Sequence, residues 1–316
     1  MNLPEIEQAA SWLESRVLQT PAREVHFPGL EALSSLTVKM ECLQTTGSFK
    51  LRGALLSLKQ LDEAQKRRGV VAVSAGNHAI ATACAAQMSG VSARVVMPVT
   101  ASMYRVARCR DYGVEPDFED DIHQAFATAE RICESEGRAF VHPFNSREMV
   151  LGSATLGLEM LESNRPDVIV IPVGGGGLLA GIALAVRQSL PECQIIGVEP
   201  EGADTMNRSF DAGKPMGIEV VRTIADSLGA PKALAMTYEI CKNNVDSLVR
   251  VSDSEIVAAM SLIHATLDMA VEPACAASTA AVLGPLRDQL EGKNVQILFC
   301  GSNYGVEDFQ QRVAAA

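Results

Sequence analysis

The sequence has fewer basic than acidic residues, so it lacks the positive charge with which proteins bind anionic polymers. Lysine and arginine together number 27, aspartate and glutamate 38, so the net charge is −11 at pH 7. This charge repels phosphate backbones and anionic membrane surfaces, which excludes nucleic acid as an expected partner. Any anionic ligand must therefore be held locally, by backbone amides or by a few placed side chains.

Paired cysteines, a signal-peptide pattern among the first residues given and long apolar runs are also missing. The eight cysteines are scattered, with no Cys-x-x-Cys pair and no histidine at zinc-finger spacing. The N-terminus carries neither a basic region nor the apolar core of a signal peptide, and no apolar run reaches ~18 residues. We therefore expect a cytoplasmic protein with reduced thiols and without a membrane partner.

The order of apolar segments predicts an α/β fold. From Leu36 onward, short β-branched runs alternate with stretches of helical period, which is typical of βαβ units on a mostly parallel sheet. The block 69–145 holds three or four such steps and is expected to form a small domain, inserted into a larger one built from 1–68 and 146–316. Each domain is expected to be a mostly parallel sheet flanked by helices. The predicted strands are 36–40, 69–73, 93–97, 139–142, 167–172, 194–199, 247–251 and 295–300.

The first segment that carries chemistry is 45–53, which reads Thr-Thr-Gly-Ser-Phe-Lys-Leu-Arg-Gly. Ser48 is expected to cap a helix whose first turn holds Lys50. The positive end of a helix dipole lowers the pKa of a lysine there, and a lysine poised as a neutral amine suits Schiff-base chemistry. A lone lysine is more often a solvated surface charge, so both interpretations stay open at this point.

The second segment is a short polar turn directly after the apolar strand 69–73. In open α/β sheets ligands bind beyond the carboxyl ends of strands, where this turn offers backbone donors and two small polar side chains to a carboxylate. The alternative is a plain turn with a helix N-cap, which short Ser/Gly/Asn clusters usually are. Its residues are Ser74, Ala75, Gly76, Asn77 and His78.

The third segment is a run of four glycines after the strand 167–172, opening an apolar helix. Glycines let the backbone approach an anion closely, and the helix N-terminus adds partial positive charge, so a phosphate site is predicted. Four consecutive glycines are hard to explain structurally, because each weakens an ordered element. They are Gly174, Gly175, Gly176 and Gly177.

The same loop has a rival interpretation as a dinucleotide site. Gly175-x-Gly177-x-x-Ala180 satisfies a loosened nucleotide fingerprint, and Glu199 ends the next strand at nearly the expected distance. An NAD-dependent enzyme is therefore a second hypothesis. Against it, the fingerprint explains neither Lys50 nor the polar turn, and such folds usually open their nucleotide domain with the first strand.

The last segments are 270–275, Ala-Val-Glu-Pro-Ala-Cys, and 298–303, Leu-Phe-Cys-Gly-Ser-Asn. A buried cysteine is commonly a small hydrophobe, but Cys300 stands at the carboxyl end of a strand. Taken together, these ordered motifs resemble the fold-type II pyridoxal-phosphate family, specifically its threonine and serine dehydratase branch, which includes the serine racemases. The similarity runs from about Gln44 to Asn303.

The resemblance implies a set of cofactor residues. Lys50 would carry pyridoxal 5'-phosphate as a Schiff base, with Phe49 against the cofactor ring. Asn77 would hydrogen-bond the ring hydroxyl, and Cys300 would face the pyridine nitrogen where serine is usual in the family. The phosphate would lie in the cradle of Gly174, Gly175, Gly176 and Gly177.

The resemblance also implies the reaction and its alternatives. The small hydroxy amino acid substrate, L-threonine, L-serine or a related 3-hydroxy amino acid, would place its carboxylate on Ser74 and the nearby amides, and Lys50 would take the α-proton. Loss of water would give a 2-oxo acid and ammonia. A racemase or a β-replacement synthase on the same fold is the alternative, although serine racemases have a second serine where this chain has Ala75.

The resemblance extends to a cation site, to the substrate pocket and to assembly. The family's cation ligands map to Glu199, Ala203 and Thr205, and a threonine in place of a carboxylate favours potassium over magnesium unless Asp204 compensates. Residues around 151–156 and 227–231 are expected to shape the substrate pocket. A homodimer is expected.

Overall fold

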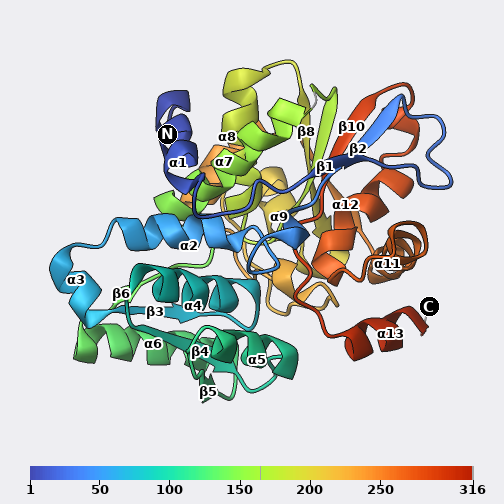
Figure 1. Cartoon of the computed structure of the whole chain (residues 1–316). Helices are drawn as coiled ribbons and strands as arrows, with labels where there is room; N and C mark the ends of the chain where they lie inside the picture. Colours follow the sequence, from blue (N-terminus) through green and yellow to red (C-terminus); the bar gives the residue numbers. More distant parts are fainter. Residues whose placement is uncertain (164, 315–316) are drawn as a thin grey trace.

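The chain folds around two β-sheets in a computed structural model that describes residues 1–163 and 165–314 (Figure 1). The larger sheet has the strand order β1-β2-β10-β7-β8-β9, and the smaller one has the order β5-β4-β3-β6. Every strand pair is parallel except β1 with β2. The predicted α/β class with mostly parallel sheets is confirmed. The strands are β1 Ala22–Glu24, β2 Ser35–Lys39, β3 Val70–Val73, β4 Ala93–Pro98, β5 Asp117–Glu119, β6 Ala139–Phe140, β7 Val168–Pro172, β8 Gln194–Pro200, β9 Ser247–Val251 and β10 Asn294–Leu298.

All eight predicted strands are present, with ends that shift by at most two residues. Sequence analysis missed β1 and β5, which are three residues long and lie at sheet edges. Both contain charged residues and are largely open to solvent, so neither shows the apolar run by which the other strands were found.

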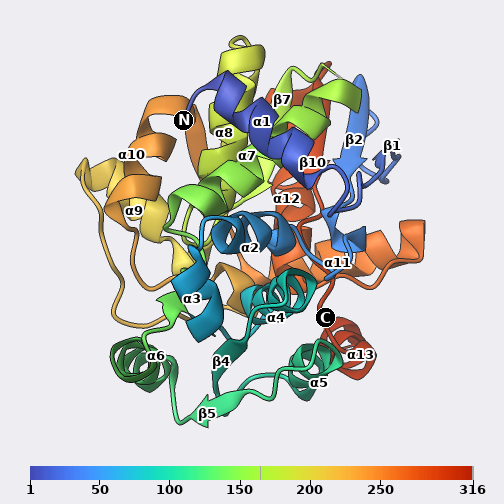
Figure 2. The same ribbon diagram turned by 60° about the vertical axis from the view of Figure 1, so that its left-hand side comes forward.

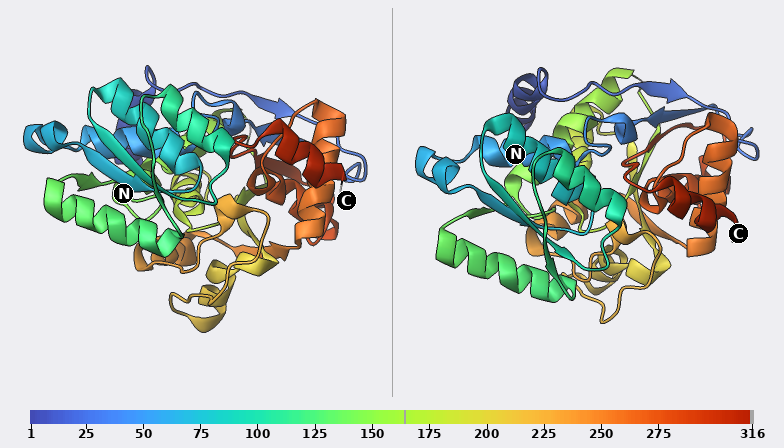
Figure 3. Two further views of the ribbon diagram at one scale, coloured as in Figure 1. Left: turned by 90° about the horizontal axis from the view of Figure 1, so that it is seen from below. Right: turned by 60° about the horizontal axis from the view of Figure 1, so that its bottom comes forward.

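Helices cover both faces of each sheet (Figures 1 and 3). On the larger sheet, α7 and α8 pack together on one side, and α12 lies on the other with α11 against it. On the smaller sheet, α4 contacts β3 and β4, while α6 contacts all four strands. Among the described residues, no helix is both long enough and apolar enough to cross a membrane. The helices are α1 Leu3–Leu13, α2 Lys50–Lys59, α3 Glu63–Arg68, α4 Asn77–Ser89, α5 Met103–Asp111, α6 Ile122–Glu136, α7 Arg147–Ser163, α8 Gly177–Ser189, α9 Thr205–Ala212, α10 Ala235–Asn244, α11 Asp253–Leu267, α12 Pro273–Leu283 and α13 Val306–Ala314.

The smaller sheet is built from the part of the chain predicted to be inserted, between 70 and 140 (Figure 1, cyan to green). The helix α2 lies between the two sheets, because it packs against α7 on one side and α4 on the other (Figure 2). Leu51 and Leu55 of α2 belong to one apolar core with Ala81 of α4 and Leu151 of α7. The exact domain boundaries stay a prediction.

A buried ion-pair network holds α2 in place. The Arg52 guanidinium donates from Nε to Glu41 Oε2 at 2.7 Å and from Nη1 to Glu159 Oε1 at 2.6 Å. Lys39 Nζ donates to the same Glu159 carboxylate at 2.6 Å. Burial raises the pKa of Glu41, but the charge and hydrogen bonds of Arg52 outweigh it, so the pKa ends below its ordinary value. The network therefore joins the end of β2, α2 and α7.

Replacing Arg52 by alanine is expected to destabilise the fold by about 3–5 kcal/mol, because the fully buried Glu41 carboxylate would lose its cation and Glu159 would keep only Lys39. The free energy of unfolding in urea measures this. Arg110→Ala is the matched control, since Arg110 pairs with Glu115 at the exposed surface and its loss should leave the unfolding midpoint unchanged. Equal midpoints for both variants would show that the Arg52 network does not hold α2.

Candidate active site

A cavity of about 490 Å³ lies at the carboxyl ends of β3, β4, β7 and β10. This is the edge at which parallel sheets place ligand sites. The structure brings all the predicted cofactor and substrate residues together around it. They are Phe49, Lys50, Ser74, Ala75, Gly76, Asn77, His78, Gly174, Gly175, Gly176, Gly177 and Cys300.

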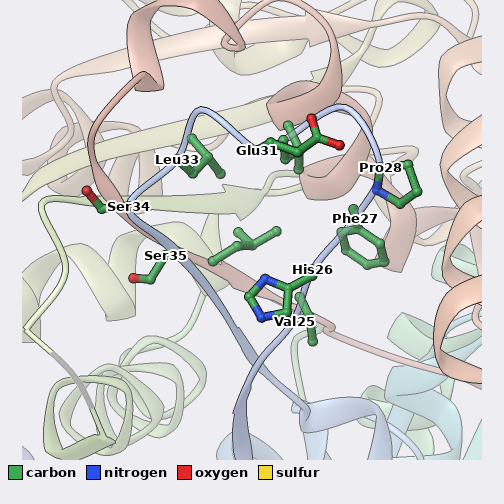
Figure 4. A pocket seen from close by; sticks show the side chains of 10 residues that line it. Val25, His26, Phe27, Pro28, Glu31, Leu33, Ser34 and Ser35 are labelled. Atoms are coloured by element: carbon green, nitrogen blue, oxygen red, sulfur yellow. The ribbon is translucent and has the colours of Figure 1, made fainter.

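A second hollow, of about 570 Å³, lies beside the chain that leads from β1 into β2 (Figure 4). Its ten lining residues all come from 25–36, and none of the predicted site residues is among them. The Glu31 carboxylate there accepts the N–H of Gly29 within the same loop. The cavity at Lys50 differs from this surface hollow because its reactive and polar residues come from segments far apart in the sequence.

Lys50 is the first residue of α2 and points its amine into the cavity. Nζ donates to the carbonyl of Pro143 at 2.5 Å and lies 5.0 Å from the centre of the Phe49 ring. Burial lowers the pKa of Lys50 to about 8, against the charges of Cys300 and Glu272, which raise it. Desolvation is thus the largest cause of the lowered pKa. The predicted Ser48 cap is wrong, because Phe49 occupies the N-cap without a side-chain bond and Ser48 Oγ has no partner.

The four glycines form a cradle that side chains would fill. A Cβ on Gly175 would lie 2.3 Å from the Phe144 ring, and one on Gly177 would lie 2.6 Å from the Phe144 carbonyl oxygen. Gly176 has a φ of 84° and is the N-cap of α8. The first N–H groups of a helix have no partner within it, so this loop offers an anion site at the cavity.

The polar turn after β3 starts α4 at the cavity. Ser74 Oγ accepts the N–H of Gly76 at 3.0 Å, and Gly76 is the N-cap of α4. His78 Nε2 donates to the carbonyl of Val141 at 2.8 Å, which fixes its proton on that nitrogen. Burial and the nearby Lys50 charge lower the pKa of His78 to about 3, so the imidazole is neutral.

Both the oxygen and the nitrogen of the Asn77 side-chain amide form hydrogen bonds. Oδ1 accepts from Asn303 Nδ2 at 2.7 Å, and Nδ2 donates to Glu272 Oε1 at 2.7 Å. An amide nitrogen carries two protons, so one remains for a group in the cavity. Cys300 lies beside it with a buried thiol, and burial raises the pKa of that thiol. Cys300 therefore presents an uncharged group, as the resemblance requires.

Sequence analysis missed Arg105, which bridges the two sheets. It lies on α5, and its guanidinium sits over Gly76, where a Cβ would be 3.1 Å from Nη1. Nη1 and Nη2 pair with Asp226, Nε donates to the carbonyl of Asn303 at 2.9 Å, and Nη2 lies 3.5 Å from Glu272. A single arginine on a helix carries no sequence signal, because its partners are more than a hundred residues away.

Only one of the two segments predicted to shape the substrate pocket lines the cavity. Residues of the 227–231 segment line the cavity, as predicted. Residues 151–156 do not, because α7 turns this stretch towards α2, where a Cβ on Gly152 would lie 2.4 Å from the amide nitrogen of Gly53. The lining from Ile122, Phe126 and Phe144 was not predicted.

The three residues of the predicted cation site lie close along the chain, between β8 and α9. The Glu199 carboxylate accepts the N–H groups of Met206 at 2.8 Å and Asn207 at 2.7 Å. Ala203 ends a short 3-10 turn and Thr205 begins α9 with a buried hydroxyl that has no hydrogen-bond partner. Asp204 does not compensate, because Arg208 and Arg250 bind its carboxylate at 2.6 and 2.9 Å. A potassium site here stays a prediction. Across residues 1–163 and 165–314, no group of three or more His, Cys, Asp and Glu side chains is arranged to hold a metal.

The residues present fit pyridoxal phosphate. A phosphate needs a cradle of free backbone amides, which the glycine loop provides, and an aldehyde needs an amine whose pKa lies near neutrality, which Lys50 provides. The spare proton of Asn77 and the neutral thiol of Cys300 match a ring hydroxyl and a ring nitrogen. All these groups face one cavity.

Comparison with known proteins agrees with this chemistry. Residues 13–301 match the family described as pyridoxal-phosphate dependent enzyme. The chain is 50% identical to a phenylserine dehydratase of Ralstonia pickettii over 281 residues, 89% of this chain and 86% of that one, and 38% identical to an L-threonine ammonia-lyase of Thermotoga maritima over 309 residues, 97% and 76%. The solved structure of maize serine racemase superposes with a TM-score of 0.92 at 34% identity, covering 99% of this chain and 97% of that one.

The chain belongs to the pyridoxal-phosphate dependent enzyme family, in its fold-type II group. Within that family it is an enzyme of the hydroxy amino acid dehydratase type, with pyridoxal phosphate as cofactor. The prediction of a dehydratase-branch enzyme is confirmed, and the dinucleotide interpretation of the glycine loop is wrong.

Glu272 generates a prediction about pH. Burial raises the pKa of this carboxyl from 4.5 to about 7, although Arg105 lowers it. Because the folded-state pKa lies above the ordinary value, the carboxyl contributes most to the unfolding free energy below about pH 4.5, where it is protonated in both states. That contribution is lost as the pH rises to about 7. Glu272→Gln removes this loss, so from pH 5 to pH 8 its unfolding free energy should improve relative to wild type, by at most about 3 kcal/mol.

Urea unfolding of both proteins at the two pH values measures the effect. Glutamine keeps an acceptor for Asn77, so the comparison isolates the charge of the carboxyl. A difference between the two proteins that does not change with pH would show that Glu272 is ionised throughout this range.

Proposed function

We propose that Lys50 holds pyridoxal phosphate in this cavity and that the enzyme removes water from L-threonine, L-serine or a related 3-hydroxy amino acid, releasing a 2-oxo acid and ammonia. One observation carries the proposal: the amine of Lys50, with its lowered pKa, faces both the glycine cradle and the polar turn within one cavity. The relatives' names, phenylserine dehydratase and L-threonine ammonia-lyase, support the same reaction on 3-hydroxy amino acids.

Different groups of the chain would bind different parts of the cofactor. The N–H groups of Gly174 to Gly177 and the start of α8 receive the cofactor phosphate. Phe49 packs against the ring, the free proton of Asn77 is donated to the ring hydroxyl, and Cys300 faces the ring nitrogen. When bound, pyridoxal phosphate supplies an electron sink for the α-carbon of the substrate.

The substrate is oriented by its carboxylate. The turn of Ser74, Ala75, Gly76, Asn77 and His78 lines the cavity and begins α4, so the N–H groups at the helix start and the proton of the Ser74 hydroxyl would bind a carboxylate there. With the substrate bound, Lys50 Nζ would take the α-proton, and the C–H electron pair would form the Cα–Cβ double bond as the C–O bond breaks. The hydroxide that leaves would take up one proton and become water. A pKa of about 8 suits this step, because a useful fraction of the amine is neutral near pH 7.

Several finer predictions remain part of this proposal. The enzyme is proposed to be a cytoplasmic homodimer, and its cation is proposed to be potassium, bound near Glu199, Ala203 and Thr205. The neutral Thr205 and the engaged Asp204 support a singly charged ion over magnesium. The division into a large domain, 1–68 with 146–316, and a small one, 69–145, rests on the separate four-stranded sheet.

Purified protein reconstituted with pyridoxal phosphate is expected to be yellow and to carry the cofactor on Lys50. Borohydride reduction followed by peptide mapping should place the pyridoxyl group on that residue. Lys50→Ala should lose the covalent label and nearly all activity, while Lys59→Ala, at the other end of α2, should keep both. Recovery of the label on a different lysine would reject the assignment.

Elimination is expected to dominate racemisation. Lys50 removes the α-proton from one face only, whereas inversion requires a proton donor on the other face, and Ala75 supplies none. Loss of a positioned acid or base typically costs ~10²–10⁴-fold in rate. Chiral chromatography of reactions with L-serine and L-threonine, alongside detection of the 2-oxo acid, measures the ratio.

Ala75→Ser is the companion variant, and it should gain racemase activity if its hydroxyl reaches the α-carbon. In wild type, D-amino acid that accumulates as fast as oxo acid would contradict the proposal. It would mean that another group serves as the second base.

A further inference from the structure

The cavity has a wall to which the proposed reaction assigns no role. It is formed by the first two turns of α6, where Ile122 and Phe126 line the cavity, together with Val221 and Phe144. All four side chains are apolar. Nothing in the binding of the cofactor or of the substrate carboxylate uses Ile122 or Phe126.

The topology of the smaller sheet places this wall beside the polar turn 74–78, called the substrate turn from here on. β5 ends at Glu119 and α6 begins at Ile122, so the helix starts at the same carboxyl edge at which the turn after β3 lies. The Asp121 carboxylate fixes that start by accepting the N–H groups of His123 at 2.7 Å and Gln124 at 2.9 Å. Ile122 and Phe126 are four residues apart and therefore lie on one side of α6.

An uncharged row of rings continues from Phe126 to the glycine loop. Ring centres are separated by 6.2 Å from Phe126 to Phe140, 5.9 Å from Phe140 to His142, and 4.8 Å from His142 to Phe144. Burial and the charge of Lys50 lower the pKa of His142 to about 4, so this imidazole is neutral. Phe144 in turn lies against Gly175.

The charges around the cavity exclude a second carboxylate on the substrate. Besides Lys50 at the reacting centre, Arg105 is the cation among the described residues that line the cavity, and it is already paired with Asp226 and Glu272. A substrate carboxylate beyond the first would meet these two acidic side chains and an apolar wall. An unpaired charge in such surroundings is strongly disfavoured.

We propose that Ile122 and Phe126 form the subsite for the substrate side chain and that they select 3-hydroxy amino acids with an aryl group on C3. The inference rests on the proposed function, because it places the side chain of that substrate. A ring of this kind packs edge-on or offset against Phe126 and fills the apolar space that serine and threonine leave empty. 3-Hydroxyaspartate is rejected by the charges.

The test compares kcat/KM for L-threo-3-phenylserine, L-threonine and L-threo-3-hydroxyaspartate on the holoenzyme, scored by 2-oxo acid. Wild type should favour phenylserine over threonine by at least about 10-fold, and hydroxyaspartate should be the poorest. Phe126→Ala should lower kcat/KM for phenylserine by about 10–200-fold, mainly through KM, with little change for threonine. Phe126→Leu, which keeps most of the apolar volume, should show a smaller loss of the same kind.

Phe118→Ala is the matched control, because Phe118 lies on β5 of the same sheet, is 42% exposed and does not line the cavity. It should leave all three values unchanged. A second readout is calorimetric binding of L-phenylalanine and L-alanine, which lack the leaving hydroxyl. Phe126→Ala and Phe126→Leu should weaken only L-phenylalanine.

The outcomes separate the subsite from the reaction. If none of the three substrates releases oxo acid while L-phenylalanine still binds through Phe126, the proposed function fails and the apolar subsite stands. If oxo acid forms but threonine or hydroxyaspartate is preferred, the subsite is wrong. Equal losses for phenylserine and threonine in the Phe126 variants would also overturn it, because they would show a structural role only.

Discussion

The buried guanidinium of Arg52 is the constraint on which the active site depends. Its two carboxylate partners come from the 3-10 turn that follows β2 and from α7, so it fixes α2 relative to the larger sheet. Lys50 begins α2 two residues earlier, and the position of its amine therefore follows from this network. Buried ions give up hydration, and only close bidentate geometry offsets that cost. The hydrogen bonds of 2.6 to 3.0 Å to Glu41 and Glu159 provide that geometry.

The two sheets contribute different residues to this site. The larger sheet presents the glycine loop and Cys300, and the smaller sheet presents the substrate turn and the start of α6. Arg105 ties the smaller sheet to the loop that contains Asp226, whose side chain is 52% exposed. Asn77, which bonds Glu272 and Asn303, is a second link between the substrate turn and the part of the chain that carries the larger sheet. The cavity is complete only when both sheets are in this arrangement.

Local sequence patterns were sufficient for most of the fold and for the lysine, the polar turn and the glycines that line the site, but not for Arg105, Ile122, Phe126 or Phe144. Strands with apolar runs, the four glycines and the turn after β3 each have a signature within a few residues. Pairs such as Arg52 with Glu159, or Arg105 with Asp226, have none, because their partners are about a hundred residues apart in sequence. The expected pocket wall at 151–156 failed for a related reason: α2 and α7 approach at Gly53 and Gly152, which turns that stretch inward.

Burial has the largest effect on the pKa values of the titratable side chains at the cavity. Burial is the largest cause both of the lowered pKa of Lys50, about 8, and of the raised pKa of Glu272, about 7, so each group is shifted towards its neutral form. The two are also coupled, because the charge of Glu272 raises the pKa of Lys50. A neutral Glu272 therefore makes the free amine easier to form. His78 and His142 are neutral as well, which leaves the ion pair of Arg105 and Asp226 at the cavity. In the proposed reaction, backbone amides at the start of α4 would receive the substrate carboxylate, which would leave the amine of Lys50 free to act as a base.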